Sequence, residues 1–144
     1  MLKHYWKFFY LPAAISYHHN YPYGLFEHTV ETIQNALLIY QGRENIELDK
    51  DLIIAGALLH DIGKINCYDI NNETIVFTEL ADKQGHIING IKIVSKHVKS
   101  EKLDQLIHII SSHHYFIEWG STVSPQCNEA YIIFIADLLS AKLF

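Results

Sequence analysis

The chain has 144 residues, of which 49% are hydrophobic and 19% are charged. This balance excludes an intrinsically disordered chain and is typical of one compact domain with its own core. The net charge of −5 argues against a generally basic, nucleic-acid-coating surface, and no apolar run reaches the roughly 20 residues of a membrane span. Cys67 and Cys127 are far apart, which argues against a disulfide framework and predicts a reduced, cytoplasmic location.

The first 23 residues are aromatic and show neither helical nor strand periodicity. Two prolines in this segment exclude a long helix, so we expect it to pack irregularly on the body of the protein. Residues 16–24 are predicted to form a loop. That loop is either a hydrophobic anchor with incidental histidines or a lip of a site that brings His18 and His19 near a substrate.

Apolar residues at helical spacing predict five helices. They cover residues 25–41, 52–60, 83–98 and 103–110 and a last segment that begins near 128. We expect Gly42 to end the first helix and Asp49 to cap the second. Residues 67–77 predict a short β-hairpin that turns at Asn71 and Asn72. The fold class is therefore all-α in the main, a bundle of about five core helices with one hairpin.

The apolar run that ends the second helix leads directly into His60 and Asp61, then Gly63 and Lys64. A buried carboxylate is unfavourable unless it is paired or binds a metal. An imidazole nitrogen beside a carboxylate oxygen suits Mn, Fe, Ni, Zn or Mg ions. The alternative is a helix C-terminus, with Gly63 as its cap and His60 and Lys64 as cations in the last turn.

Other candidate ligands lie near helix ends or inside apolar helices. They are His28, His86, His113, His114 and Asp137. With His60 and Asp61 they supply five imidazoles and two carboxylates, enough for two divalent ions that share one bridging carboxylate. Two such metal ions stabilise both the attacking and the leaving oxygen of a phosphoryl transfer.

The order His28, His60-Asp61, Asp137, with "LLHDIGK" at its centre, resembles the HD-domain metal-dependent phosphohydrolase superfamily over about residues 16–144. Within it the chain is most similar to the HD half of YhaM-type 3′–5′ exoribonucleases. The similar stretches are "GLFEHTVE", "DLIIAGALLHDIGKI", "GHIINGIKI", "SSHHYFIEWGS" and "EAYIIFIADLLSAKL". "LPAAISYHHNYPYGLFEHT" is also similar to the HD-like domain of conjugative relaxases. The resemblance implies a single HD domain over residues 1–144, with residues 1–23 packed on it.

The resemblance also implies roles for the candidate residues. It implies a first ion held by His28, His60 and Asp137, a second held by His86, His113 and His114, and Asp61 as the bridge. Lys64 would face the substrate phosphate, and a metal-activated water would be the nucleophile. Independently of the resemblance, the interpretation of residues 16–24 as a lip of the site would place His18 and His19 near the substrate.

Two departures from the YhaM type bear on the substrate. That type carries an N-terminal OB-type nucleic-acid-binding domain, for which we expect no room here, and bulky Tyr23 and Tyr115 stand where it tends to have glycine. We therefore expect a phosphodiesterase or nucleotidase that acts on nucleotides or short oligonucleotides, without strong binding of long RNA. One alternative is a non-catalytic regulatory module that binds metal or nucleotide. A less favoured alternative is a di-iron oxygenase. Homo-oligomer formation stays open.

Overall fold

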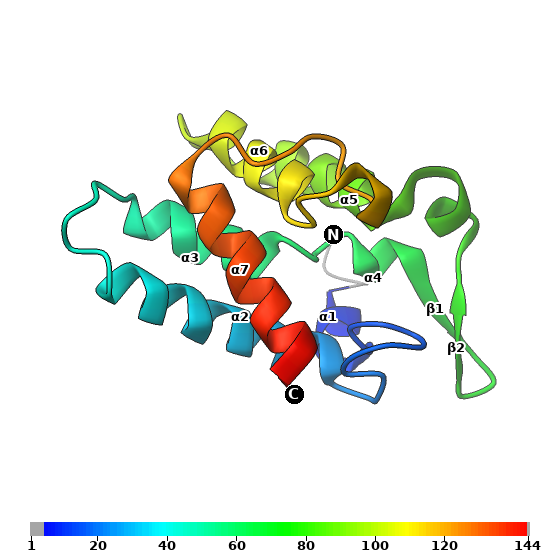
Figure 1. Cartoon of the computed structure of the whole chain (residues 1–144). Helices are drawn as coiled ribbons and strands as arrows, with labels where there is room; N and C mark the ends of the chain where they lie inside the picture. The colour runs from blue at the N-terminus through cyan, green and yellow to red at the C-terminus, as the bar shows by residue number, and fades with distance from the viewer. Residues whose placement is uncertain (1–4, 144) are drawn as a thin grey trace.

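A computed structural model describes residues 5–143 as a helical bundle with one hairpin (Figure 1). The long helices are α2 (Gly24–Gln41), α3 (Lys50–Leu59), α5 (Glu79–His97), α6 (Leu103–Ser112) and α7 (Asn128–Leu143). The short elements are α1 (Trp6–Tyr10), α4 (Lys64–Cys67), the 3-10 helix η1 (Ile117–Trp119) and the antiparallel strands β1 (Tyr68–Asn71) and β2 (Thr74–Phe77). The predicted mainly α fold with five core helices and one hairpin is confirmed.

Helix α3 is the centre of the bundle because it packs against α2, α7 and α6 at once. Its Ile53 is fully buried, as are Ile109 of α6 and Ile133 of α7. Helix α5 packs against α6 and against α4, the short helix that follows α3. The C-terminal end of α3 therefore lies where all five long helices converge. Between residues 5 and 143, every helix is too short or too polar to serve as a transmembrane span.

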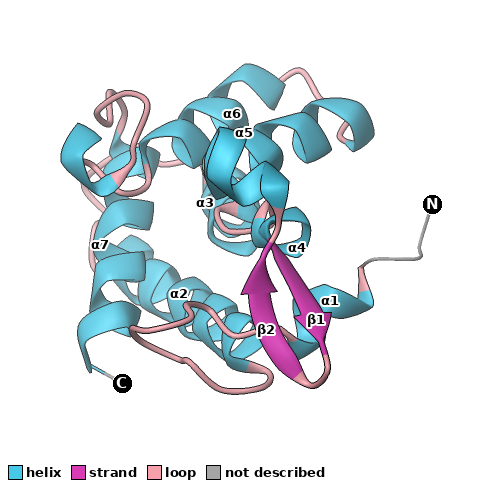
Figure 2. Ribbon diagram, turned by 90° about the vertical axis from the view of Figure 1, so that its right-hand side faces the viewer, coloured by secondary structure: helices cyan, strands magenta, loops and turns pink. Residues whose placement is uncertain are grey.

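The N-terminal segment contains a short helix, α1, that its sequence pattern did not predict. Phe8 and Leu11 are buried in the core, and Lys7 Nζ donates hydrogen bonds to the Tyr68 carbonyl oxygen at 3.2 Å and to Asp69 Oδ1 at 3.0 Å. These bonds hold α1 beside β1 at the edge of the bundle (Figure 2). Residues 1–4 of the predicted aromatic segment lie outside the described residues.

Two predicted boundaries were wrong. The hairpin turns at Asn72 and Glu73, with φ of 48° and 65°, while Asn71 still pairs with Thr74. A two-residue turn with positive φ at both residues matches the twist of the two strands. The turn therefore lies one residue later in the chain than predicted. Helix α5 begins at Glu79 rather than Lys83, because the side chain of Thr78 accepts a hydrogen bond from the Ala81 amide at 3.2 Å and caps it.

The cap predicted for α3 is present, since Asp49 Oδ1 accepts a hydrogen bond from the Leu52 amide at 3.0 Å. Helix α5 is interrupted at Gly85, whose φ of 70° and ψ of 171° are not helical. His86 therefore begins the second part of α5. This kink places His86 at a helix start that faces the end of α3 and the turn into α4.

Candidate metal centre

The turn between α3 and α4 carries three polar side chains into the bundle. Helix α3 ends at Leu59, and His60, Asp61 and Lys64 follow, all buried. Gly63 has a φ of −64°, so the alternative of a helix end capped by a left-handed glycine is wrong. Glycine is required there for another reason: a Cβ atom would lie 1.9 Å from the His86 carbonyl oxygen. The absence of that atom lets the turn approach α5.

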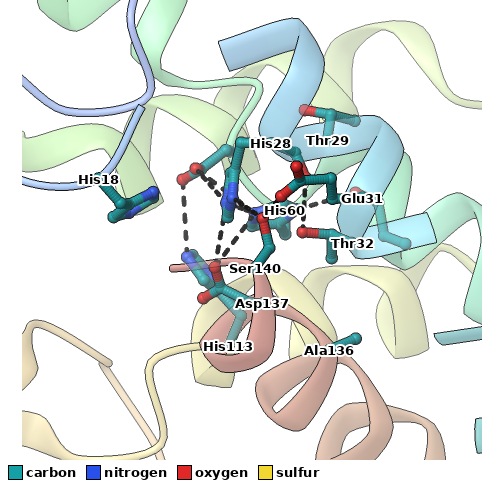
Figure 3. A network of polar contacts seen from close by, with 12 residues as sticks. His18, His28, Thr29, Glu31, Thr32, His60, His113, Ala136, Asp137 and Ser140 are labelled. Carbon is teal, nitrogen blue, oxygen red and sulfur yellow. Dashed lines mark hydrogen bonds and ion pairs between the residues drawn. The ribbon is translucent and has the colours of Figure 1, made fainter. Parts of the chain in front are cut away.

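A first cluster joins His28 of α2, His60 and Asp137 of α7 (Figure 3). One ligand atom of each residue lies within 4.8 Å of the others. His28 Nε2 is 3.0 Å from Asp137 Oδ1 and 3.2 Å from His60 Nε2. His28 and His60 are fully buried. Because α2, α3 and α7 pack on one another, these distant positions meet in the core.

A second cluster joins His86 of α5 to His113 and His114, which follow α6. Their ligand atoms also lie within 4.8 Å of one another. Within the second cluster, the His113 ring lies next to the first, with its centroid 5.1 Å from the His60 ring and 5.6 Å from the His86 ring. The two clusters are therefore adjacent.

Asp61 lies between the two clusters and directs one carboxylate oxygen to each. Its Oδ2 is 3.4 Å from His60 Nε2 and 3.6 Å from His28 Nε2. Its Oδ1 is 3.5 Å from His86 Nε2 and 3.7 Å from His113 Nε2. The structure thus brings together all seven side chains that the sequence suggested as metal ligands.

Three of the imidazoles are held in one tautomer by main-chain carbonyl oxygens, which can only accept. The Nδ1 atoms of His60, His113 and His114 donate at 2.8, 2.7 and 2.6 Å to the carbonyl oxygens of Ala57, Ile110 and Trp119. With its hydrogen on Nδ1, each neutral ring keeps its lone pair on Nε2. The Nε2 atoms of all three therefore point into the clusters as ready ligands.

His28 is oriented by a longer chain of hydrogen bonds that the sequence analysis missed (Figure 3). Its Nδ1 donates to Ser140 Oγ at 2.8 Å, and Ser140 Oγ donates to Glu31 Oε2 at 2.6 Å. Such outer partners typically fix the rings of metal-binding histidines. The sequence spacing could have indicated both residues. Glu31 lies three positions after His28 and Ser140 three after Asp137, and residues three apart lie on the same face of a helix.

Three buried atoms of the centre have no hydrogen-bond partner within the described residues. They are Asp61 Oδ1, His86 Nε2 and His113 Nε2. Buried polar atoms are rarely left unpaired, because each then loses the hydrogen bonds it made to water. These three face one another, and their mixed nitrogen and oxygen character suits a divalent transition metal. The residues present therefore fit a metal ion at this place.

The electrostatics also favour cation binding. Burial lowers the pKa of His86 to about 3 and that of His113 well below its usual value, so both rings are neutral at pH 7. Burial alone would raise the pKa of Asp61, but the Lys64 ammonium, 2.6 Å away, holds it well below its usual range. Neutral imidazoles and ionised carboxylates are the forms that bind metal.

The two histidines predicted near the substrate take different positions. His18 is half-buried, its ring centroid lies 4.7 Å from that of His28, and burial lowers its pKa to about 4. His19 is buried, with Nδ1 at 3.1 Å from His18 Nδ1 and Nε2 at 3.1 Å from Glu31 Oε2. His18 lines the open pocket, whereas His19 lies behind it against Glu31.

The centre opens into a pocket of about 760 Å³. Its polar lining consists of His18, Asp61, Lys64, His113, His114, Asp137 and Lys142. Its apolar lining consists of Tyr17, Trp119, Phe134, Leu138 and Ala141. Solvent-borne ligands therefore have access to both clusters.

Comparison with known proteins agrees with this arrangement. The chain is 36% identical over 146 residues to the 3′–5′ exoribonuclease YhaM of Bacillus subtilis (strain 168), in an alignment that covers 98% of this chain and 46% of YhaM. It therefore spans about half the length of that relative. No solved structure matches the chain significantly. The family model of the HD domain matches residues 25–142, from the start of α2 to the end of α7, and the chain therefore belongs to the HD domain family.

Proposed function

We propose that this chain is a metal-dependent phosphohydrolase that cleaves phosphoester bonds of nucleotides or short oligonucleotides. The observation that carries the proposal is the position of Asp61, whose two oxygens face two different clusters of ligand atoms. A carboxylate in this position suits a pair of divalent ions. When bound, such ions supply Lewis acidity toward phosphate oxygens and activate water at neutral pH.

Each cluster would hold one ion. His28, His60 and Asp137 would hold the first, and His86, His113 and His114 would hold the second, with Asp61 shared. The chain itself prepares these ligands, because carbonyl oxygens and Ser140 keep four of the five rings with Nε2 directed inward. Metal binding therefore needs little rearrangement of the protein.

Lys64 is suited to bind a phosphate oxygen of the substrate. Burial lowers the pKa of its ammonium, but Asp61, Tyr68 and Asp137 together more than offset this and raise the pKa above its usual value. The side chain therefore stays cationic while it lines the pocket. His18 lines the same pocket and, with its pKa near 4, is a neutral hydrogen-bonding group there at pH 7.

The relatives and the charge of the chain bear on the substrate. YhaM is named a 3′–5′ exoribonuclease, and it cleaves a phosphodiester. This chain has a net charge of −5, which disfavours tight binding of long RNA. We therefore propose short substrates that reach the pocket by diffusion and do not need an extended basic groove.

The test is turnover by metal-loaded protein. We expect Mn-loaded protein to contain about two ions per chain and to hydrolyse bis-p-nitrophenyl phosphate and dinucleotides, and we expect chelation to abolish both activities. Asp104→Asn, an exposed change on α6, is the control for Asp137→Asn, which should lose metal and turnover. Full metal content without hydrolysis of any phosphoester would refute the proposal and favour a regulatory module that binds metal.

A further inference from the structure

The pocket above the candidate metal centre has a polar depth and an aromatic mouth. Asp61 and Lys64 are only 2% and 7% exposed, whereas Tyr17 and Trp119 are 80% and 55% exposed, and all four line the same pocket. Phe134 adds a half-buried aromatic ring to the lining. Aromatic surface therefore stands at the opening, with cationic and metal-binding groups beneath it.

The aromatic rings at the pocket are held by the segment after α6, which also orients His114 of the second cluster. Trp119 ends η1, and its carbonyl oxygen accepts the hydrogen bond from His114 Nδ1 at 2.6 Å. Its ring packs edge-on against Phe116, with centroids 4.7 Å apart. Phe134 packs against Tyr115 with centroids 4.9 Å apart. These contacts help to hold the rings of Trp119 and Phe134 in place.

Exposed rings are common on this protein, but Tyr17 and Trp119 are exposed together at the pocket that leads to the candidate metal centre. A tryptophan and a tyrosine that contributed mainly to the core would be largely buried, and here each leaves most of its side chain open at a pocket. Nucleobases stack on such rings regardless of base identity, because every base has a π-face. A phosphate requires a cation, and Lys64 and Lys142 both line this pocket.

We propose that Trp119 and Tyr17 form a base-binding subsite on which the base of a nucleotide stacks while its phosphate lies at Lys64. This inference rests on the proposed function and deepens it by naming the group that selects the substrate. The pocket volume of about 760 Å³ fits a mono- or dinucleotide. Lys142 then supplies a second cation for the next phosphate of a dinucleotide.

The chain contains only two tryptophans, which makes the subsite directly observable. Trp6→Phe leaves Trp119 as the sole tryptophan of the protein. We expect adenosine 5′-monophosphate to quench its fluorescence saturably in Mg²⁺-loaded protein, because stacking brings the base against the indole. Ribose 5-phosphate and inorganic phosphate, which lack a base, should not quench it. Absence of saturable quenching by the nucleotide would overturn the subsite.

Two matched substitutions test the energy of the contact. Trp119→Leu should weaken the binding of adenosine 5′-monophosphate by roughly tenfold to a hundredfold in calorimetry, as expected for loss of one base stack. Affinity for ribose 5-phosphate and metal content should stay unchanged. Trp6→Leu is the control, because Trp6 is 51% exposed but does not line the pocket. Unchanged nucleotide affinity in Trp119→Leu would overturn the proposal.

If Trp119→Leu fails to fold, Tyr17→Ala provides the same test, because Tyr17 is almost fully exposed and its removal disturbs little packing. The outcomes also separate this inference from the proposed function. Base-dependent binding without phosphoester hydrolysis would keep the subsite and refute the hydrolase. Hydrolysis that is unaffected by both substitutions and by removal of the base would keep the hydrolase and refute the subsite.

Discussion

Gly63 and His86 are in such close contact that a Cβ atom on Gly63 would lie 1.9 Å from the His86 carbonyl oxygen. Both atoms belong to the main chain or are fixed to it, so relief requires α5 to move away from the turn that carries Asp61. Gly63→Ala should therefore lower the free energy of unfolding by about 1–3 kcal/mol and weaken metal binding. Urea denaturation and metal titration measure the two effects.

Gly42→Ala is the control for this substitution. Gly42 has a φ of −81°, and the nearest heavy atom to an added Cβ lies 3.6 Å away. We expect a change of at most about 0.5 kcal/mol there. If Gly63→Ala were as mild, the close approach of the turn to α5 would not be what positions Asp61 beside His86.

Asp61→Asn should separate a bridging ligand from a scaffold residue. The amide keeps the size of the side chain but removes the charge on which both ions would depend. We expect loss of at least one ion per chain and a decrease in turnover of roughly a thousandfold or more, equivalent to several kcal/mol of transition-state stabilisation. Elemental analysis, activity and thermal midpoint on one preparation test this. Full metal content with near wild-type turnover would contradict the bridging role.

Lys64→Met should show how much the Lys64–Asp61 ion pair contributes to the free energy of unfolding. Methionine fills much of the space of the lysine stem but leaves the carboxylate of Asp61 buried without its cation. Without metal, the variant should be less stable by about 3–5 kcal/mol. Added Mn²⁺ should recover much of that loss, because bound ions replace the missing positive charge. Urea denaturation in chelator and in Mn²⁺ measures the loss of stability without and with metal. An equal loss under the two conditions would contradict this account.

Ser140→Ala tests the hydrogen-bond chain behind His28. Without Ser140 Oγ, the Nδ1 hydrogen of His28 loses its acceptor and the ring is free to change tautomer or orientation. Loss of such an outer partner should weaken metal affinity by about 10- to 100-fold while the fold persists. Thr29→Val is the control, since its buried hydroxyl donates only to the Leu25 carbonyl oxygen of its own helix. Equal effects of the two substitutions would exclude an orienting role for Ser140.

Metal affinity should fall as the pH is lowered, and the pKa of His60 should set the pH at which the fall begins. Burial lowers the pKa of His60, but the Asp61 and Asp137 carboxylates and the Ala57 carbonyl oxygen together outweigh burial and raise it. A proton then competes with metal for Nε2 below that raised pKa, whereas above it the neutral ring is available. His86, with its pKa near 3, stays neutral throughout. Competition assays with a chelator at several pH values measure this, and affinity independent of pH down to about pH 4 would contradict it.

Local sequence signals were sufficient for most of the fold. Apolar residues at helical spacing located the long helices, and Asp49 marked the start of α3, because amphipathic periodicity and capping act over a few residues. The same locality explains the errors. The cap at Thr78 was overlooked, and the hairpin turn was misplaced by one residue because adjacent asparagines both favour turns.

The sequence by itself also predicted the candidate metal ligands, because His and Asp within apolar helices need a partner. It could not determine that Asp61 directs one oxygen to each cluster, that Gly63 lies against His86, or that Trp119 stands at the pocket mouth. Those facts depend on how α3, α5, α6 and α7 pack. Periodicity assigns a residue to a face of its own helix, but only tertiary packing fixes the distances between side chains that are far apart in the chain.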